Sequence, residues 1–310
     1  MSLSHTLAVF EAFDSPRASG RTVVDLIGDA PAVTVVVETV QGERGSTDFV
    51  RIDIPGSTGR RSGGSAPSLG IIGRLGGIGA RPSRIGLVSD ADGAIAAVAI
   101  ARKLAAMRRE GDVLPGDVIV TTHICPNAPT RPHLPVDFMD SPVSIEVMNA
   151  REVVAEMDAV LSIDTTKGNR VLNHRGIAIS PTVKEGWILK VAPDLLRILE
   201  MTSGRAPVTF PITTQDITPY GNGVDHINSI LQPATATSAP VVGVAIGAES
   251  VVPGCGTGAS REVDIAEAVR FAIEVAKETG AGGCKFHDAV EFDRLVSLYG
   301  SMKHLQLPSR

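Results

Sequence analysis

The chain has 310 residues, of which 43% are hydrophobic and 20% are charged, and its formal net charge is −5. This length and apolar content suffice for one large core, so we expect a single α/β domain over residues 1–310. The small net charge, without long basic runs, argues against a nucleic-acid partner. No apolar run approaches the roughly 20 residues that span a bilayer, which argues against a membrane partner. Three widely spaced cysteines predict reduced thiols and a cytoplasmic location.

The amino-terminal part predicts short elements followed by a long glycine-rich loop. Residues 4–13 and 20–27 fit helices, and residues 32–40 and 49–54 fit strands. Residues 56–82 contain so many glycines that we expect a loop whose backbone lies close to another part of the chain. The segment GRLGGIGA has glycines at the spacing of a nucleotide loop, but no Gly-Lys-Ser/Thr ending follows. A packed wall is therefore the favoured interpretation.

The clearest unit is a strand, helix and strand over residues 85–126. Residues 85–88 fit a short strand, and Asp90 and Asp92 follow it on a turn that opens a helix over residues 94–109. Residues 117–121 fit a second strand, whose end delivers His123 and Cys125. Right-handed crossovers bring the carboxyl ends of parallel strands to one edge of a sheet, and ligands bind at that edge. We therefore expect these polar side chains to meet.

The middle of the chain adds a third polar strand end. A proline-rich loop over residues 126–142 precedes a helix over residues 149–157. A strand over residues 159–163 then ends at Asp164, with Lys167 close behind it. Because this strand continues the same alternation of strands and helices, Asp164 is expected at the same edge as Asp90 and His123.

The last third of the chain contains the densest polar segment. Residues 177–179 and 188–191 fit a strand pair around Lys184 and Glu185, residues 194–201 a helix and residues 208–211 a strand. The segment TTQDITPYGNGVDHIN follows and includes Asp216, Asn222 and His226. A strand over residues 241–246 leads into a glycine-rich turn that carries Cys255 and Thr257, and helices over residues 263–279 and 288–299 follow.

Six motifs carry a resemblance to a known family. They are THICPNAPTRPH, LSIDTTKGN, ISPTVKEG, TTQDITPYGNG, HINSILQP and PGCGTGAS, and together they cover nearly the whole chain. With them the chain resembles the bacterial family called domain of unknown function 1177, which brings no established activity. The order of strand, Asp turn, long helix, strand, polar turn and strand ending in Asp is also similar to the co-catalytic zinc aminopeptidases. That similarity implies a zinc-peptidase-like three-layer α/β/α sandwich with a mixed, mostly parallel sheet.

The zinc aminopeptidases hold two zinc ions with a His-x-Asp, an Asp at the start of the long helix, a Glu-Glu pair, a further acid and a late His. The resemblance places Asp90 at the bridging Asp and Asp164 at the later acid. Elsewhere the chain departs from that pattern. Arg51-Ile52-Asp53 stands at the first His-x-Asp, His123-Ile124-Cys125 near the Glu-Glu pair, and Gly256-Thr257-Gly258 near the last His.

Three functions remain open. The first is a metal-dependent hydrolase of an amide or peptide-like bond in a small molecule or short peptide, with Glu185 or Asp216 as the base. Its divalent ion (Zn, Mn or Ni) would be held by residues drawn from Asp90, Asp92, His123, Asp164 and His226. Its substrate would be bound by Lys167, Lys184, Asn222 and Thr257. This hypothesis predicts one ion per chain, which is lost on Asp90→Ala or Asp164→Ala.

The second function is a cofactor-free racemase or isomerase, in which Cys125 and Cys255 exchange a proton across a substrate carbon. It requires that at least one of the two thiols has a low pKa. The third is a non-catalytic ligand-binding protein on a hydrolase-like fold. For each of the three functions we expect a homo-oligomer.

Each candidate residue also has a purely structural interpretation. Asp90 and Asp92 equally fit helix caps, and Asp164 fits an acceptor in an Asx turn. His123 equally fits a hydrogen-bonded structural histidine, and Cys125 a small buried hydrophobe. Lys167 and Lys184 fit a solvated surface, and His226 fits a helix start. The functional interpretation predicts that Asp90, His123, Cys125, Asp164 and at least one of Asp216, His226 or Cys255 line a single cleft.

Overall fold

Nine strands form one mixed sheet in the computed structural model, which describes residues 1–74, 76–134, 136–166, 168–250, 258 and 260–307. The strand order is β1-β2-β4-β3-β7-β11-β9-β10, and β8 also pairs with β11. These strands are β1 (Thr34–Gly42), β2 (Gly45–Ile54), β3 (Leu69–Gly73), β4 (Val118–Ile124), β7 (Ala159–Thr166), β8 (Gly176–Ile179), β9 (Val183–Lys184), β10 (Trp187–Ile188) and β11 (Val241–Gly247). A separate hairpin joins β5 (Thr130–Arg131) to β6 (Phe138–Met139) within the proline-rich segment.

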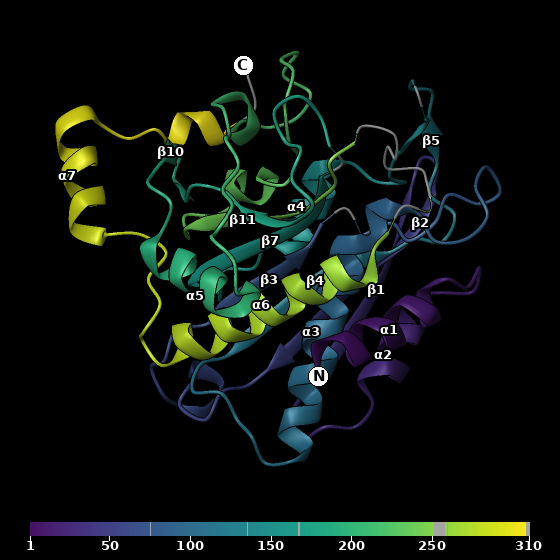
Figure 1. Cartoon of the computed structure of the whole chain (residues 1–310), viewed down its shortest axis with the longest axis horizontal. Coiled ribbons are helices and arrows are strands. Elements are labelled where there is room, and N and C mark those ends of the chain that lie inside the picture. Colours follow the sequence, from purple (N-terminus) through teal and green to yellow (C-terminus); the bar gives the residue numbers. More distant parts are fainter. Residues whose placement is uncertain (75, 135, 167, 251–257, 259, 308–310) are drawn as a thin grey trace.

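Helices cover both faces of this sheet (Figure 1). They are α1 (Ser2–Phe13), α2 (Gly20–Ile27), α3 (Asp92–Arg109), α4 (Ile145–Glu152), α5 (Pro193–Ser203), α6 (Glu262–Gly280) and α7 (Ala289–Tyr299). Short 3-10 turns are η1 (Arg60–Ser62), η2 (Ser89–Ala91), η3 (Gln215–Ile217), η4 (Gln232–Thr235) and η5 (Lys303–Gln306). None of the helices in the described ranges is long and apolar enough to cross a membrane.

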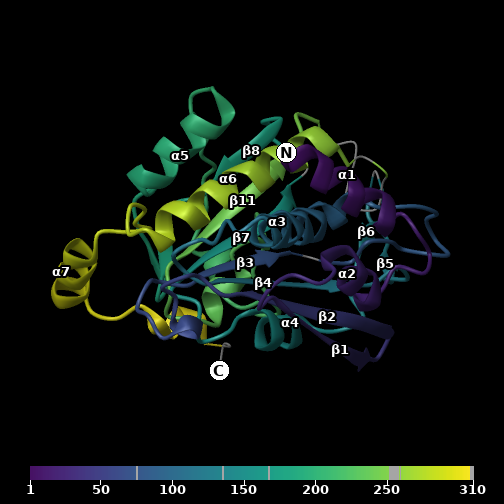
Figure 2. The same ribbon diagram turned by 90° about the horizontal axis from the view of Figure 1, so that it is seen from below.

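The helices and the sheet form three layers. Figure 2 shows α1, α3, α5 and α6 on one side of the sheet and α4 on the other. The larger apolar core lies under the first group, where α3 and α6 pack against each other, and a second core lies on the opposite face. The expected three-layer α/β/α sandwich with a mixed sheet is confirmed, and the four central strands of this sheet are parallel.

The four central strands position the residues of the candidate functional site. β4, β3, β7 and β11 run parallel to one another, whereas β1, β2, β8 and β9 are joined to the sheet in antiparallel fashion. The carboxyl ends of β3, β4 and β7 therefore lie at one edge of the sheet, as the crossover rule predicted. β4 and β7 are longer than the sequence pattern indicated, so His123 and Asp164 lie within these strands rather than after them.

The strand that precedes α3 was predicted at the wrong place. Residues 85–88 form no strand, and β3 instead lies inside the expected glycine-rich loop. Its glycines serve close packing: an added Cβ at Gly70 would lie 2.3 Å from Sδ of Met157, and one at Gly73 would lie 2.6 Å from the carbonyl oxygen of Gly93. The glycines that suggested a loop are therefore those that let a buried strand sit tightly between its neighbours.

Smaller corrections concern the second half of the chain. The helix expected over residues 149–157 begins and ends earlier, as α4. Residues 208–211 form only an isolated bridge, between Thr209 and Ile179. The strand pair expected around Lys184 does not form, because β8 pairs with β11 while β9 and β10 make their own hairpin. Each error follows from pairing between distant segments, which local periodicity does not report.

Gly93, in the first turn of α3, is the closest contact between that helix and the sheet. A Cβ added there would lie 2.3 Å from the carbonyl oxygen of Arg74 and 2.5 Å from that of Ile163. We expect Gly93→Ala to lower the free energy of unfolding by about 1–3 kcal/mol, because neither backbone oxygen can easily move. Urea unfolding measures the effect. A gain in stability, which helix propensity alone would give, would contradict this packing.

Candidate functional site

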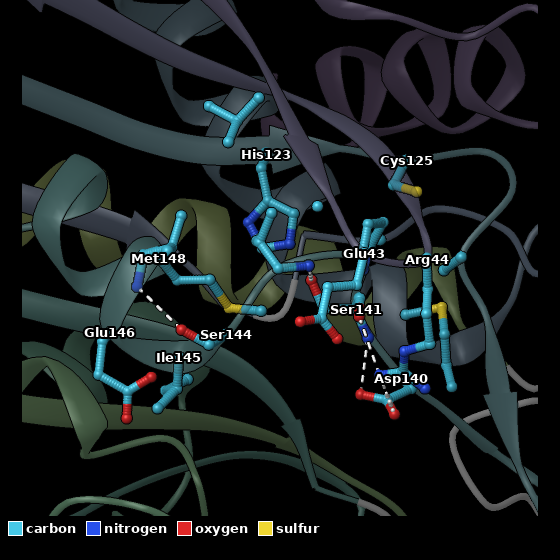
Figure 3. A pocket seen from close by; sticks show the side chains of 18 of the residues that line it. Glu43, Arg44, His123, Cys125, Asp140, Ser141, Ser144, Ile145, Glu146 and Met148 are labelled. Atoms are coloured by element: carbon cyan, nitrogen blue, oxygen red, sulfur yellow. Dashed lines mark hydrogen bonds and ion pairs between the residues drawn. The ribbon is translucent and has the colours of Figure 1, made fainter.

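A cavity of about 860 Å³ lies against the carboxyl edge of the parallel strands. Asp90, His123 and Cys125 line it, together with Tyr220 and Ser229 from the polar segment that follows residue 213. Figure 3 shows His123 and Cys125 at this cavity, with the ion pair of Arg44 and Asp140 nearby. The volume falls within the roughly 300–1,000 Å³ of small-molecule sites.

His123 is held by a carboxylate that the sequence did not reveal. Its side chain is 1% exposed, and Nδ1 lies 2.6 Å from Oε1 of Glu152, the last residue of α4. The Thr121 hydroxyl donates to the main-chain oxygen of Glu152 at 2.8 Å, which fixes the helix end against β4. With the proton on Nδ1, this contact leaves Nε2 as the ring atom that can accept a proton.

Arg74 lies one residue beyond the end of β3 and is fully buried. The parallel register of β3 with β4 and β7, continued to this residue, puts Arg74 between His123 and Asp164 in one row. Nε of Arg74 lies 3.4 Å from Oε2 of Glu152, and Nη2 donates a short hydrogen bond to Oδ1 of Asn149. The row therefore contains a permanent positive charge between a histidine and a carboxylate.

Asp164 is 2% exposed, and its surroundings favour the protonated form. Burial raises the pKa of Asp164 to about 7, and the negative charge of Asp92 acts in the same direction. The Thr165 amide, the Arg74 charge and the Ser229 hydroxyl lower this pKa, but they do not offset burial. Asp164 therefore exchanges a proton near neutral pH, as a general acid or base requires.

Ser229 connects Asp164 to the cavity. Its hydroxyl donates to Oδ2 of Asp164 at 3.3 Å, and it also shares a hydrogen bond with the side chain of Tyr220. Burial raises the pKa of Tyr220 to about 12, so its hydroxyl keeps its proton. Because Tyr220 and Ser229 both line the cavity, a hydrogen-bonded chain leads from the cavity wall to the buried acid.

Asp164 is expected to make the folded protein less stable as the pH rises. Between the ordinary value of 3.8 and about 7, the unfolded chain has released this proton and the folded chain still holds it. Each step up in pH within that window therefore favours unfolding. Unfolding curves of native protein and Asp164→Asn from about pH 4 to about pH 8 measure this effect. The free energy of unfolding of the variant should rise relative to that of the native protein as the pH rises. A difference that stays constant with pH would contradict it.

Hydrogen bonds from β7 and from the residues before α6 hold the turn that carries Asp90 and Asp92. The Thr165 hydroxyl donates to the main-chain oxygen of Ser89 at 2.7 Å, and the Ser260 hydroxyl donates to Oδ1 of Asp92 at 2.5 Å. Asp90 is 5% exposed and lines the cavity, whereas Asp92 is fully buried. The residue at the N-cap position of α3 is Ala91, so neither acid holds that position.

The structure gives Asp216 a place other than the cavity wall. It is fully buried, and its carboxylate accepts hydrogen bonds from the main-chain amides of Thr213, Ile227 and Asn228 and from the Thr213 hydroxyl. These bonds tie the two ends of the polar segment together. Asp216 therefore shapes the loop that presents Tyr220 and Ser229, and it does not line the cavity as the predicted base would.

His226 and Asn222 also organise this loop. The two ring nitrogens of His226 lie 3.1 Å and 3.0 Å from the carbonyl oxygens of Val224 and Thr218, so neither is directed at the cavity. The Asn222 side chain bonds to the Thr218 hydroxyl and to the Val224 amide. Neither residue joins the predicted ligand or substrate-binding set in this arrangement.

Lys184 and Glu185 lie at the other edge of the sheet. Val183, their neighbour in β9, pairs with Val241 at the amino end of β11. Both residues line a second cavity, and Lys184 donates to the main-chain oxygen of Ser238 at 2.6 Å. The structure thus separates the predicted base Glu185 and the predicted substrate-binding Lys184 from Asp90, His123 and Asp164. The predicted residues Lys167, Cys255 and Thr257 lie outside the described residues.

Cys125 lines the cavity, but its environment does not activate the thiol. It is 2% exposed, and its Sγ donates to the main-chain oxygen of Ser46 at 3.4 Å. Burial raises the pKa of Cys125, although a backbone hydrogen bond from Asn127 partly opposes it. A racemase thiol requires a shift in the opposite direction.

Comparison with known proteins places the chain in a family. The sequence model of a family described as "Protein of unknown function (DUF1177)" matches residues 38–309. The chain belongs to this family. No curated protein matches it in sequence.

A crystal structure of a glutaminyl cyclase from an Acidobacteriales bacterium is similar to this DUF1177 protein. The TM-score is 0.53 at 13% sequence identity, over 91% of this chain and 94% of that chain. At this identity the similarity shows the fold alone. It agrees with the zinc-peptidase-like fold that the order of elements indicated.

The site of this DUF1177 protein does not fit the metal centre that the zinc-peptidase resemblance implies. Among the described residues, no three His, Cys, Asp or Glu side chains are grouped so as to hold an ion. Arg74, which offers donors and no acceptor, stands between His123 and Asp164. Arg51 and Asp53, which stand where the zinc aminopeptidases have the first His-x-Asp, form an ion pair with each other, and they also pair with Glu156 and Arg61, respectively.

Three residues of the site were missed by sequence reasoning. Arg74 stood in a glycine-rich run that suggested a loop, and Glu152 looked like one more polar residue of a helix. Ser229 was not selected as a candidate, because the acidic residues and the histidine earlier in the same segment were chosen instead. The available signal was Arg74 itself, because it is the one charged residue in the apolar and glycine-rich run from Leu69 to Ala80.

Proposed function

We propose that this protein is an enzyme that breaks or forms an amide bond in a small molecule or short peptide held in the 860 Å³ cavity. One observation supports the proposal above all others. Two hydrogen-bonded chains of proton-exchanging groups lead to this single cavity: Glu152 with His123, and Asp164 with Ser229 and Tyr220. Amide chemistry needs both a base and an acid at one carbon centre.

His123 is the base in this proposal. Glu152 fixes the tautomer and the ring orientation and stabilises the imidazolium that forms when Nε2 takes a proton. For hydrolysis, the proton comes from a water molecule whose oxygen adds to the substrate carbonyl carbon. For cyclisation, it comes from an amine of the substrate that attacks the same carbon.

Asp164 is the acid. Its raised pKa lets it carry a proton near neutral pH, and the Ser229 hydroxyl links it to the cavity. When the carbon–nitrogen bond breaks, this proton reaches the leaving nitrogen through Ser229, and the proton held by His123 later restores Asp164 by way of solvent. Asp90, on the cavity wall, is placed to bind a cationic or hydrogen-bond-donating part of the substrate. No step is assigned to zinc, manganese or nickel, because the described donors do not gather around one point.

The test is turnover by the purified protein against a panel of amide substrates. The panel contains aminoacyl anilides, short peptides, N-acyl amino acids and peptides with an amino-terminal glutamine, the last because the structural neighbour is a glutaminyl cyclase. Each reaction is run with and without a chelator. We expect turnover of at least one class, unchanged by the chelator and abolished by Asp164→Ala.

Two outcomes would contradict the proposal. If no class is turned over but panel members raise the melting temperature, the protein is a ligand-binding protein on this fold. If turnover appears but survives both His123→Asn and Asp164→Ala, the chemistry lies elsewhere in the molecule. Glu156→Gln is a matched control, since Glu156 is an exposed carboxylate paired with Arg51 and lies outside the cavity.

A further inference from the structure

Arg74 is the largest fully buried side chain in the described part of the chain. Such a charge is costly unless it is paired, and here it has specific partners. Besides its contacts with Glu152 and Asn149, Nη1 lies 3.7 Å from Sδ of Met148. Asn149 is held in turn by its amide, which donates to the main-chain oxygen of Gln232 at 3.2 Å. The guanidinium is therefore anchored on α4.

The spacing of the strands makes the position of Arg74 decisive for metal binding. Neighbouring strands lie about 4.7–4.9 Å apart, so His123 and Asp164, which are two strands apart, start from backbones roughly 9–10 Å apart. Bonds from zinc to nitrogen or oxygen ligands are about 2.0–2.2 Å long. An ion shared by His123 and Asp164 would lie over the strand between them, and the residue at the middle position of the row would be the nearest further ligand. That middle position belongs to Arg74.

An arginine there cannot serve as that ligand. Its guanidinium offers five N–H donors, has no acceptor atom and stays charged in proteins. It also repels a divalent cation from the Glu152 carboxylate, with which it forms an ion pair, and from Asp164, whose pKa its charge lowers. The same side chain forms an ion pair with Glu152, without a hydrogen bond between Nε and Oε2, and Glu152 in turn contacts His123.

We infer that Arg74 is the resident cation of this site: its guanidinium lies beside Glu152, in the row that also holds His123 and Asp164, and supplies there the positive charge that a divalent ion would bring, so that the DUF1177 protein works with this fixed charge in place of a metal. Arg74 is fully buried and does not line the cavity, so it is a positioning residue that acts through Glu152. The inference rests on the geometry of the row and does not depend on the proposed amide chemistry.

Metal uptake by native protein and by Arg74→His tests the inference without an activity assay. Each protein is incubated with zinc, manganese or nickel, dialysed and analysed for bound metal by mass spectrometry, with circular dichroism to confirm folding. Native protein should retain no ion. Arg74→His should retain one ion per chain, because the new imidazole supplies the missing middle ligand, and this ion should be lost when Asp164→Asn is added.

Arg51→His is the matched control. Arg51 also lies between two carboxylates, Asp53 and Glu156, but it pairs with Thr121 on β4 and lies outside the row, at the position that the zinc-peptidase resemblance gives to the first His-x-Asp. We expect no stoichiometric uptake by this variant. Uptake of one ion per chain by native protein, removed by His123→Asn or Asp164→Asn, would overturn the inference, as would a folded Arg74→His protein that retains no metal. If Arg74→His does not fold, metal uptake by the native protein alone decides the matter: no retained ion supports the inference, and one retained ion per chain overturns it.

Discussion

The His123→Asn variant is expected to lose about 10²–10⁴-fold in kcat/KM on the amide substrate that the panel identifies, because that is the usual contribution of a positioned general base. Asparagine preserves a polar side chain that can still hydrogen-bond to Glu152, but it has no atom that accepts a proton near neutral pH. The fold should persist, and the loss should appear mainly in kcat, since proton transfer occurs in the transition state.

Two further variants separate catalysis from packing. Glu152→Gln should lose part of the same activity, because the amide still contacts Nδ1 but no longer stabilises an imidazolium. His133→Asn is the matched control, since His133 is an exposed histidine that stacks on Phe138 with ring centroids 3.8 Å apart. Equal activity losses in His123→Asn and His133→Asn would refute the assignment of His123 as the base.

The Arg74→Met variant is expected to lower the free energy of unfolding at neutral pH by about 3–5 kcal/mol, the cost of breaking a buried ion pair by removal of one partner. Methionine has a similar apolar stem but leaves Glu152 charged and uncompensated in the interior. It also leaves the Asn149 carbonyl oxygen without its donor. Chemical denaturation measures the loss.

The pH dependence of this loss identifies its cause. As the pH falls through about 7, Asp164 takes up a proton and no longer interacts with the Arg74 charge, so the cost of losing that charge should shrink. Arg51→Met is the control, because Arg51 is 26% exposed, Glu156 is 52% exposed and Asp53 keeps its ion pair with Arg61, which predicts a loss of about 1 kcal/mol or less. A loss in Arg74→Met that is equally large at every pH would point to lost packing rather than to uncompensated charge.

The sequence by itself determined the fold class and one edge of the site. Alternating apolar strands and amphipathic helices predicted a parallel sheet, and the crossover rule then placed Asp90, His123 and Asp164 at its carboxyl edge. The structure has His123 and Asp164 there, within β4 and β7, with Asp164 joined to the cavity through Ser229, whereas Asp90 reaches the cavity wall from the turn η2, without the strand that was predicted before it. Such predictions succeed because strand direction follows from chain order and local periodicity. The oligomeric state stays a prediction.

Only the tertiary structure decided which side chains work together. Whether Glu152 contacts His123, and whether Arg74 lies between His123 and Asp164, depends on the register between strands and on where α4 docks. The same holds for Glu185, which a polar turn made a plausible base but which pairing of β9 with β11 carries to the opposite edge. Strand register and helix docking are set by packing between residues far apart in the sequence. Local sequence patterns carry no signal for such packing.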